Sequence, residues 1–282
     1  MSLRTRVGNV PRPAAPPSAA PASLRSRPPG YAAMEACLAE RAVSPRNALE
    51  RLIGIAPLRR PVRELHDLAL LEAETATALA ALPADWTVLH SVPLSTTVIP
   101  HLAMGPAGVF AIFPQLPRGA AAEFVAGQLL VDGVATRTLE AVRRCAAEAH
   151  DVLAPVLPYG VTVAPVLAFV GPRRLTLRAG PADVAVVDSA GLAGWLRRLP
   201  EICSALQVDR MADGAESPAT WGARDGGGDT LRHRSRFARL QSEMDQADHR
   251  WLLTVRALVV AGLGVTVVSA AVVGSLLGAL AR

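Results

Sequence analysis

The sequence feature that most constrains this chain is a run of 25 residues without a charge, 257–281, which reads ALVVAGLGVTVVSAAVVGSLLGALA. About 20 consecutive apolar residues are enough for a helix to cross a bilayer. A helix buried in a globular core is rarely so uniformly apolar, because one side usually meets polar groups or solvent. The run therefore predicts one transmembrane helix, with the lipid bilayer as the partner of residues 257–281.

Arginine is distributed unevenly around this run. Arg282 follows it, and six arginines lie shortly before it: Arg232, Arg234, Arg236, Arg239, Arg250 and Arg256. Because cytoplasmic flanks carry the excess of positive charge, this asymmetry predicts a single-pass, tail-anchored protein of the cell membrane with residues 1–256 in the cytoplasm. The three cysteines, Cys37, Cys145 and Cys203, are odd in number and far apart, which fits a reducing compartment.

The predicted juxtamembrane helix and the predicted span each carry a row of residues suited to helix association. Before the span, apolar residues recur at heptad spacing, which is typical of a short coiled coil or of a helix lying on lipid: Phe237, Leu240, Met244, Ala247 and Trp251. Within the span, Ala270, Gly274 and Gly278 form a row of small residues that favours close packing. The rows lie on different helix faces, so one straight interface cannot use both. A homodimer through these helices is one expectation.

The rest of the chain divides by composition. Residues 1–35 are rich in Pro and Arg and poor in large apolar groups, which predicts a disordered tail. Residues 36–60 carry a short helical segment, and residues 61–222 have the length and apolar content of one α/β domain. Three successive glycines, 226–228, lie within residues 223–256, which we expect to form a linker and the juxtamembrane helix.

Hydrophobic periodicity predicts the order of elements inside the α/β domain. Helices are expected where apolar residues recur at helical spacing, and strands where short apolar runs lie between turn residues. The predicted helices cover 64–82, 136–157 and 190–199, and the predicted strands cover 86–94, 97–104, 108–113, 127–133, 161–171, 174–179 and 183–188. Helix, three strands, helix and strand in this order predict a mixed sheet flanked by helices.

Several stretches of residues 68–222 resemble the nuclease-related domain (NERD) family. They are LEAETATALAALPADWTVLHSVPL (71–94), HLAMGPAGVFAI (101–112), GQLLVDG (127–133), PVLAFVGP (165–172) and DVAVVD (183–188). The resemblance implies a restriction-endonuclease-like fold of the PD-(D/E)xK nuclease class. It also implies a site that binds Mg²⁺ through a helix glutamate, an aspartate on the second strand and an acid at the end of the third strand, where a lysine follows.

When the family's site is compared with this chain residue by residue, one of the four expected groups is present. Glu74 stands at the helix glutamate, whereas Pro100 replaces the aspartate, and Phe113 and Gln115 replace the acid and the lysine of the third strand. Pro and Phe side chains have no metal-binding atom, and a neutral Gln carries no charge to stabilise an attacking hydroxide. All 29 basic residues are arginine, so no lysine elsewhere can substitute. The resemblance thus implies a degenerate site without a metal or cofactor, in which Glu74 is the surviving catalytic candidate.

Simpler interpretations exist for the polar residues of this region. Glu74 also fits a surface glutamate on an amphipathic helix, and His90 and His101 fit ordinary strand histidines. Ser91 follows His90, but no acid is placed to complete a hydrolytic triad. Five arginines could form either a nucleic-acid contact or a solvated face: Arg143, Arg144, Arg173, Arg174 and Arg178.

The sequence therefore favours a membrane-anchored, NERD-like protein that is catalytically inactive and acts as a binding or scaffolding module. The alternative is a divergent nuclease that uses Glu74 and Mg²⁺, or a protein that binds nucleic acid at the membrane.

Overall fold

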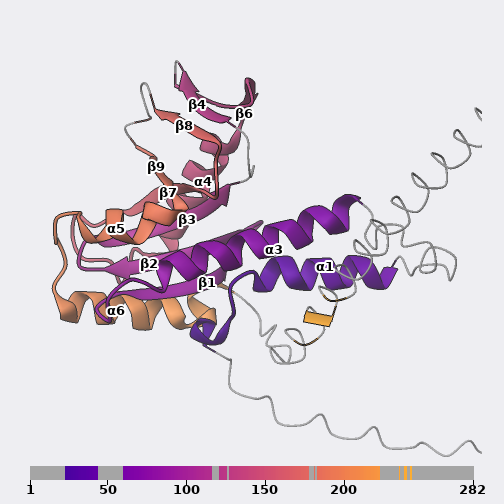
Figure 1. The fold of residues 1–282 in the computed structure, drawn as a ribbon. Coiled ribbons are helices and arrows are strands. Elements are labelled where there is room, and N and C mark those ends of the chain that lie inside the picture. The colour runs from indigo at the N-terminus through magenta and orange to yellow at the C-terminus, as the bar shows by residue number, and fades with distance from the viewer. Residues whose placement is uncertain are drawn as a thin grey trace, which may run out of the picture.

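Two sheets and the helices around them form the described part of the chain (Figure 1). The computed structural model describes residues 23–43, 60–115, 121–125, 127–177, 181, 183–222, 235, 238–239 and 242. The helices are α1 (Tyr31–Val43), α3 (Arg60–Leu79), α4 (Thr138–Leu153), α5 (Leu192–Arg197) and α6 (Ala205–Glu216), with the short 3-10 helices η1 (Leu24–Ser26), η2 (Ser189–Gly191) and η3 (Pro218–Trp221). The strands are β1 (Thr87–Pro93), β2 (Val98–Gly105), β3 (Gly108–Gln115), β4 (Ala121–Val125), β5 (Gln128–Val131), β6 (Val134–Thr136), β7 (Val163–Phe169), β8 (Arg174–Leu177) and β9 (Ala185–Asp188).

The larger sheet has the strand order β1-β2-β3-β7-β9. β1, β2 and β3 pair antiparallel, whereas β3, β7 and β9 pair parallel. The β2–β3 turn needs a glycine, because a Cβ atom on Gly105 would lie 2.2 Å from the ring of Trp86. Trp86 in turn stacks near Phe110 of β3, with ring centroids 5.9 Å apart. The two strands predicted at 97–104 and 108–113 are confirmed, and they form a hairpin.

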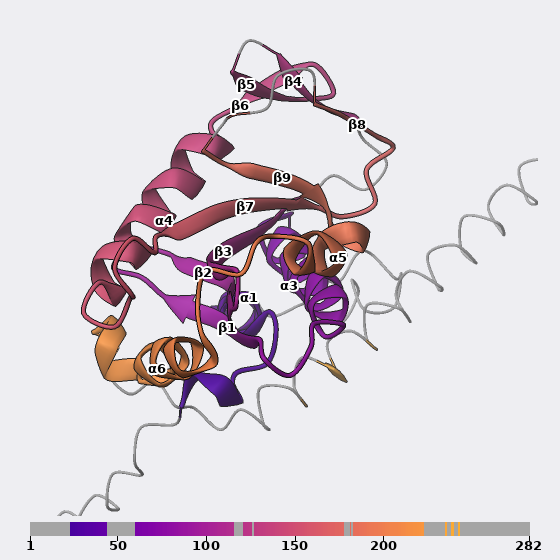
Figure 2. The same ribbon diagram turned by 90° about the vertical axis from the view of Figure 1, so that its left-hand side faces the viewer.

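The smaller sheet extends from the parallel part of the larger one. Its order is β6-β5-β4-β8, and β4 and β8 pair parallel. β4 follows β3 in the chain, and β8 follows β7. The two segments that pair in parallel as β3 and β7 in the larger sheet therefore pair in parallel again as β4 and β8 in the smaller sheet. Figure 2 shows the smaller sheet beyond the ends of β7 and β9, with α4 returning from it along the larger sheet.

Helices cover both faces of the larger sheet, and strand alternation assigns the side chains to them. Val109, Ala111 and Phe113 of β3 belong to the main core, which includes apolar residues of α4 and α6. Phe110 and Ile112 point the other way and belong to a second cluster with residues of α3 and α5. This two-residue period is the expected consequence of strand geometry. The predicted class, a mixed α/β fold flanked by helices, is therefore confirmed.

The edge of the larger sheet at β1 is covered by the N-terminal segment. Leu24 of η1 is fully buried in the main core, and Arg25 forms an ion pair with Glu216 of α6. α1 then packs on α3 through Met34 and Cys37. Edge strands present unpaired backbone groups, and a helix or loop laid over them prevents pairing with other chains. The tail predicted to be disordered up to residue 35 is thus wrong from residue 23 onward, because Leu24 and α1 have apolar surface to bury.

Several other elements differ from the sequence prediction. α6, β4 and β6 were not predicted: β6 is only three residues long, and the run at α6 mixes charged and apolar residues. Residues 44–59 of the predicted short helical segment lie outside the described residues, as do the glycines 226–228 and the predicted span 257–281. Among the helices that the structure describes, none combines the length and the apolar character that crossing a bilayer requires.

Candidate functional site

The fork between β2 and β3 is where the resemblance predicts the metal site. The paired part of the β2–β3 ladder stops at His101 and Ile112. Pro100 and Phe113 are the next residues on the two strands, so they lie at the point where the strands separate, with Gln115 two residues farther along β3. The fold therefore brings together the positions at which the resemblance expects acids. The side chains present there, Pro and Phe, offer no metal ligand.

Phe113 completes a core instead of lining a site. Its side chain is only 8% exposed and belongs to the main cluster with residues of α4 and α6. In the parallel β3–β7 register, Phe113 pairs with Leu167 and Gln115 pairs with Phe169, and both partners are fully or almost fully buried. Gln115, at the end of the strand, is half-buried. The fork is thus closed by apolar packing up to the last residue of β3.

Glu74 lies apart from the fork. It is exposed on α3, and α3 packs on the face of the sheet opposite to the one where Phe113 packs. The structure therefore does not bring Glu74 together with Phe113 and Gln115. The glutamate that α3 turns inward is Glu72, which is 4% exposed. Residues two positions apart on a helix point in directions that differ by about 200°, so only one of Glu72 and Glu74 can face the sheet.

The sequence prediction missed Glu72, although a pattern could have identified it. Leu65, Ala69, Glu72, Ala76 and Leu79 recur at spacings of four and three, and all five are buried or half-buried. That spacing marks one face of a helix. Glu72 occupies an interior position of this apolar row, which is where a lone carboxylate is least expected.

The carboxyl group of Glu72 is buried near the backbone N–H of Gly30, and its Oε2 atom has no hydrogen-bond partner. Burial disfavours the charged form and raises the pKa of Glu72 to about 7, while the nearby Gly30 N–H acts in the opposite direction. Gly30 has φ +73°, and a Cβ atom there would lie 2.9 Å from the carbonyl oxygen of Ala69. Glycine is therefore required for this close approach to α3.

Two histidines form a hydrogen-bonded pair across β1 and β2. The Nδ1 atoms of His90 and His101 lie 2.8 Å apart, and the rings meet edge to face. One Nδ1 must carry a proton and the other must accept, so protonating the second ring would set two N–H groups against each other. Burial lowers the pKa of His90 to about 4 and that of His101 well below its usual value, and the neighbouring ring lowers the latter further. Both rings are therefore neutral at pH 7.

His101 also connects this pair to α3. Its ring is fully buried, and its Nε2 atom faces the backbone of Glu72 without forming a hydrogen bond of good geometry. Buried nitrogens without a full partner are costly. Glu72, His90 and His101 thus form a polar seam between α3 and the β1–β2 pair.

Ser91 has a structural part in the same region. It adopts φ +51°, an uncommon value for a residue with a side chain, and it is fully buried. Its Oγ accepts from the N–H of Ala32 at 3.3 Å, and its carbonyl oxygen accepts from Arg27 at 2.7 Å. A serine so enclosed and engaged cannot act as a nucleophile toward an incoming substrate.

The residues at the fork do not fit a magnesium ion. Mg²⁺ takes oxygen ligands, usually from one or two carboxylates and from substrate phosphates. Pro100 and Phe113 supply none, and Gln115 supplies at most a neutral amide oxygen. Across the ranges that the structure describes, no three His, Cys, Asp or Glu side chains are grouped so as to hold a metal.

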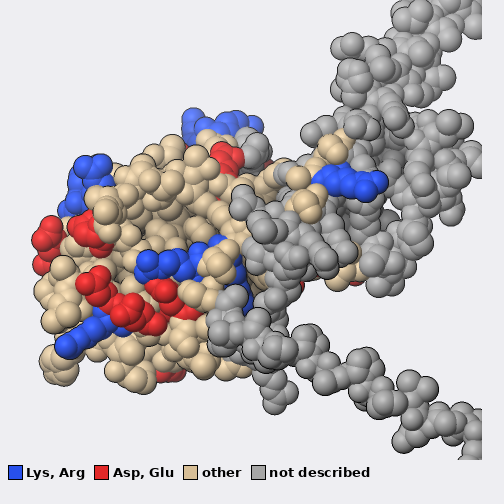
Figure 3. Space-filling view, turned by 90° about the horizontal axis from the view of Figure 1, so that it is seen from below, with Lys and Arg blue, Asp and Glu red and all other residues tan. Residues whose placement is uncertain are grey.

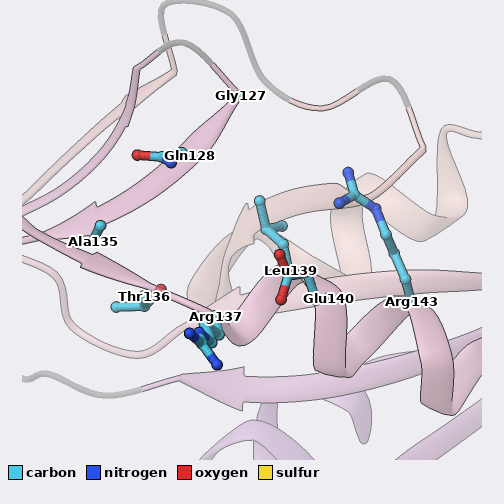
Figure 4. A pocket seen from close by; sticks show the side chains of 8 residues that line it. All are labelled: Gly127, Gln128, Ala135, Thr136, Arg137, Leu139, Glu140 and Arg143. Carbon is cyan, nitrogen blue, oxygen red and sulfur yellow. The ribbon is translucent and has the colours of Figure 1, made fainter.

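A cavity of about 280 Å³ lies between the β5–β6 hairpin and the start of α4 (Figure 4). It is lined by Gly127, Gln128, Ala135, Thr136, Arg137, Leu139, Glu140 and Arg143. Arg143 is held by both carboxylate oxygens of Asp183, at 2.6 and 2.8 Å, and this guanidinium keeps the pKa of Asp183 below its usual value. Arg137 and Glu140 have opposite charges, so the lining has no single sign that would select a charged ligand.

The fork and the polar seam therefore differ in chemical character. The fork is apolar and closed, whereas the seam buries a carboxyl group and two imidazoles. Comparison with family models, curated proteins and solved structures found no match for this chain.

Proposed function

We propose that this chain is a membrane-anchored, NERD-like protein whose nuclease-like domain is catalytically inactive and acts as a binding or scaffolding module. The observation that carries the proposal is the packing of Phe113 at the end of β3, in the main core and at the fork that the resemblance assigns to the metal. A restriction-endonuclease-like fold is supported by the mixed sheet with helices on both faces. The anchor is supported by the uncharged run 257–281.

A nuclease assay on the purified full-length chain tests this proposal. We expect no cleavage of DNA or RNA with Mg²⁺ or Mn²⁺. Cleavage that is abolished by Glu74→Ala would contradict the proposal and would establish the divergent nuclease. Glu64→Ala, on the same helix, is the matched control, because Glu64 is also exposed.

One observation suggests which acid a divergent nuclease would use. Asp188 ends β9 and pairs with Phe169, which pairs with Gln115, so these three residues form a row across the carboxyl ends of the parallel strands. Ligands of open α/β sheets often bind at such ends. Asp188, however, uses its Oδ1 to accept from the N–H of Ala190 at 3.0 Å. A nuclease activity lost in Asp188→Asn but retained in Glu74→Ala would place the catalytic acid here.

Nucleic-acid binding through arginines has weaker support. Arg143 is paired with Asp183, and Arg173 lies 3.7 Å from Asp132, so carboxylates compensate two of the candidate cations. Figure 3 shows the described basic and acidic side chains interspersed on the face seen there. A stripe of one sign is the expected footprint of a phosphate-backbone contact. Arg178 lies outside the described residues.

The membrane part of the proposal is tested by fractionation. A charged residue at the centre of a span costs about 2.5–3.5 kcal/mol on insertion scales. Val268→Arg should therefore release a measurable share of the chain into the soluble fraction, whereas Val255→Arg, just before the uncharged run, should not. Protease added outside intact cells should leave residues 1–256 whole. Their digestion would contradict the cytoplasmic orientation.

A further inference from the structure

One end of the domain carries several exposed apolar side chains. Among the residues that the structure describes, six large apolar side chains are exposed, and three of them lie at this end: Tyr159, Ile202 and Leu206. They come from the segment before β7, the α5–α6 connection and the first turn of α6. β3 and β7 begin here, where Val109 pairs with Val163. In Figure 1 the α5–α6 connection runs down the left-hand side, and Figure 2 turns that side toward the viewer.

The β2–β3 turn fixes the α5–α6 connection at this end. The backbone N–H groups of Ile202 and Cys203 both donate to the carbonyl oxygen of Pro106, at 2.8 and 2.9 Å. A Cβ atom on Gly108 would lie 3.5 Å from the Cδ1 atom of Ile202, which is ordinary van der Waals contact. Ile202 is nevertheless 56% exposed. Its backbone is therefore held in place while most of its side chain faces outward.

Two tryptophans flank the same turn. The ring centroids of Trp86 and Trp195 lie 5.9 and 6.0 Å from that of Phe110. Both tryptophans are only half-buried, so part of each ring remains at the surface. Trp and Tyr combine a large apolar body with one polar group, and they are enriched where a membrane meets water. The apolar end of the domain comprises five side chains: Trp86, Tyr159, Trp195, Ile202 and Leu206.

Charges of both signs surround the apolar end. Arg197 and Arg198 are exposed at the end of α5, whereas Asp85 and Glu201 are exposed next to Trp86 and Ile202 in the sequence. A nucleic acid or a strongly charged protein would require a surface of one sign. The attraction that this end offers is therefore the burial of apolar surface.

The bilayer is the apolar partner that the rest of the chain brings within reach. The 34 residues 223–256 separate Gly222 from the uncharged run 257–281. A chain of that length spans about 110 Å when fully extended, at about 3.3 Å per residue. α3, a helix of 20 residues, is only about 30 Å long. Either end of the domain can therefore reach the bilayer, and the exposed apolar side chains select the end that does.

We infer that the apolar end rests on the bilayer that anchors residues 257–281, with Tyr159, Ile202 and Leu206 inserted among the lipid headgroups. A planar surface can contact side chains from three separate segments at once. The smaller sheet follows the opposite ends of β3 and β7, so a domain docked in this way turns the smaller sheet and its cavity away from the membrane. The inference rests on the anchor of the proposed function, and it holds whether or not the domain is a nuclease.

Quenching of a fluorescent label by brominated lipid measures the contact directly. The three native cysteines are buried, so a cysteine introduced by Leu206→Cys can be labelled selectively with bimane. The full-length chain is reconstituted into phosphatidylcholine vesicles with or without bromine on the acyl chains. The label at 206 should lose fluorescence in the brominated vesicles. Val134→Cys is the matched control, because Val134 is 68% exposed on the smaller sheet and Leu206 is 61% exposed, and its label should keep its fluorescence.

Further substitutions in the Leu206→Cys chain make the result specific to the apolar end. Tyr159→Asp and Ile202→Asp should each lower the ratio of quenched to unquenched label about tenfold, because a charge replaces an apolar group that lipid buries. Tyr159 is fully exposed, so its substitution leaves the core of the domain intact. Val125→Asp changes an exposed valine of the smaller sheet and should leave the ratio unchanged. Adding phosphatidylglycerol should also change the ratio little, because the charges around the apolar end are mixed.

Docking is overturned if the chain floats with the vesicles while the label at 206 is not quenched, or if the labels at 206 and 134 are quenched alike. Quenching that requires phosphatidylglycerol would overturn the assignment to apolar side chains. A label at 206 that is shielded from aqueous iodide but not quenched by bromine would mean that a protein, such as a second copy of the chain, covers this end instead. A chain that does not float with vesicles overturns the anchor and the docking together, so the two proposals fail by different results.

Discussion

The fork at the end of β3 and the polar seam under α3 lie on different parts of one sheet and differ in the chemistry they bury. At the fork, Phe113 fills a place where a polar site is expected, and it is packed by α4 and α6. At the seam, Glu72 and His101 are buried where an apolar interface is expected. The comparison shows that the end of β3 is closed by apolar packing, while the polar groups buried on this sheet lie elsewhere.

The same comparison indicates which region responds to pH. The fork is enclosed by the main core, and opening it would expose Phe113 and its neighbours. A buried carboxyl group favours its neutral form, so its ionisation at high pH destabilises the folded state, whereas a buried Phe has no such pH dependence.

The largest expected effect comes from placing a charge in the apolar packing at the fork. Phe113→Glu removes a buried ring and places a carboxyl group in the main core, so it should lower the free energy of unfolding by about 3–5 kcal/mol. Urea denaturation of a segment covering residues 23–222 measures it. Phe113→Leu keeps the apolar character and should cost less than about 1.5 kcal/mol. An unchanged midpoint for Phe113→Glu would show that the fork is open to water, in favour of the nuclease alternative.

The second prediction concerns the pH dependence of the polar seam. The folded state raises the pKa of Glu72 from 4.5 to about 7, so its contribution to stability is complete below pH 4.5 and is lost as the pH rises to 7. Glu72→Gln has no such loss. The variant should gain about 3 kcal/mol relative to the wild type between pH 4.5 and pH 7, at 1.36 kcal/mol per pKa unit. Denaturation series of both proteins at several pH values measure the difference, and a constant difference would contradict the buried acid.

The third prediction separates the histidine pair from Glu72. His90→Ala leaves the Nδ1 atom of the buried His101 without its partner and should cost about 1–3 kcal/mol at pH 7. The folded state lowers the pKa of His90 from 6.5 to about 4, so the wild type loses stability as the pH falls through this range. The cost of His90→Ala should therefore shrink on acidification. A cost that grows instead would show that the ring is charged in the folded state.

The smallest expected effect sharpens the distinction between two glutamates of α3. Glu74→Gln changes an exposed side chain and should alter the free energy of unfolding by no more than about 0.5 kcal/mol, at any pH between 5 and 8. Thermal denaturation in parallel with Glu72→Gln measures it. A loss comparable to that of a core substitution would mean that Glu74 has a structural part that its exposure does not indicate.

Local periodicity was enough to predict most of the fold. The alternation of apolar residues predicted the helix at α3, the hairpin of β2 and β3, and the buried strand β7, because each pattern extends over seven or more residues. β6 has three residues, too few for a period to be recognised. η1 was not predicted, because Leu24 is the only large apolar residue among neighbouring Pro, Ser and Arg. Leu24 stabilises the fold by packing into the main core, which is formed by residues distant in the sequence.

The sequence by itself determined that no lysine, and no acid at Pro100 or Phe113, is available for a nuclease site, because residue identity alone decides which atoms exist. It also determined that Glu72 and Glu74 face different sides of their helix, since side chains two positions apart on a helix differ in direction by about 200°. Only the tertiary structure decided which of the two is buried, because that depends on where the sheet and α1 pack against α3. Packing between distant segments likewise placed Gly30 near Glu72 and paired His90 with His101, and no local pattern contains that information.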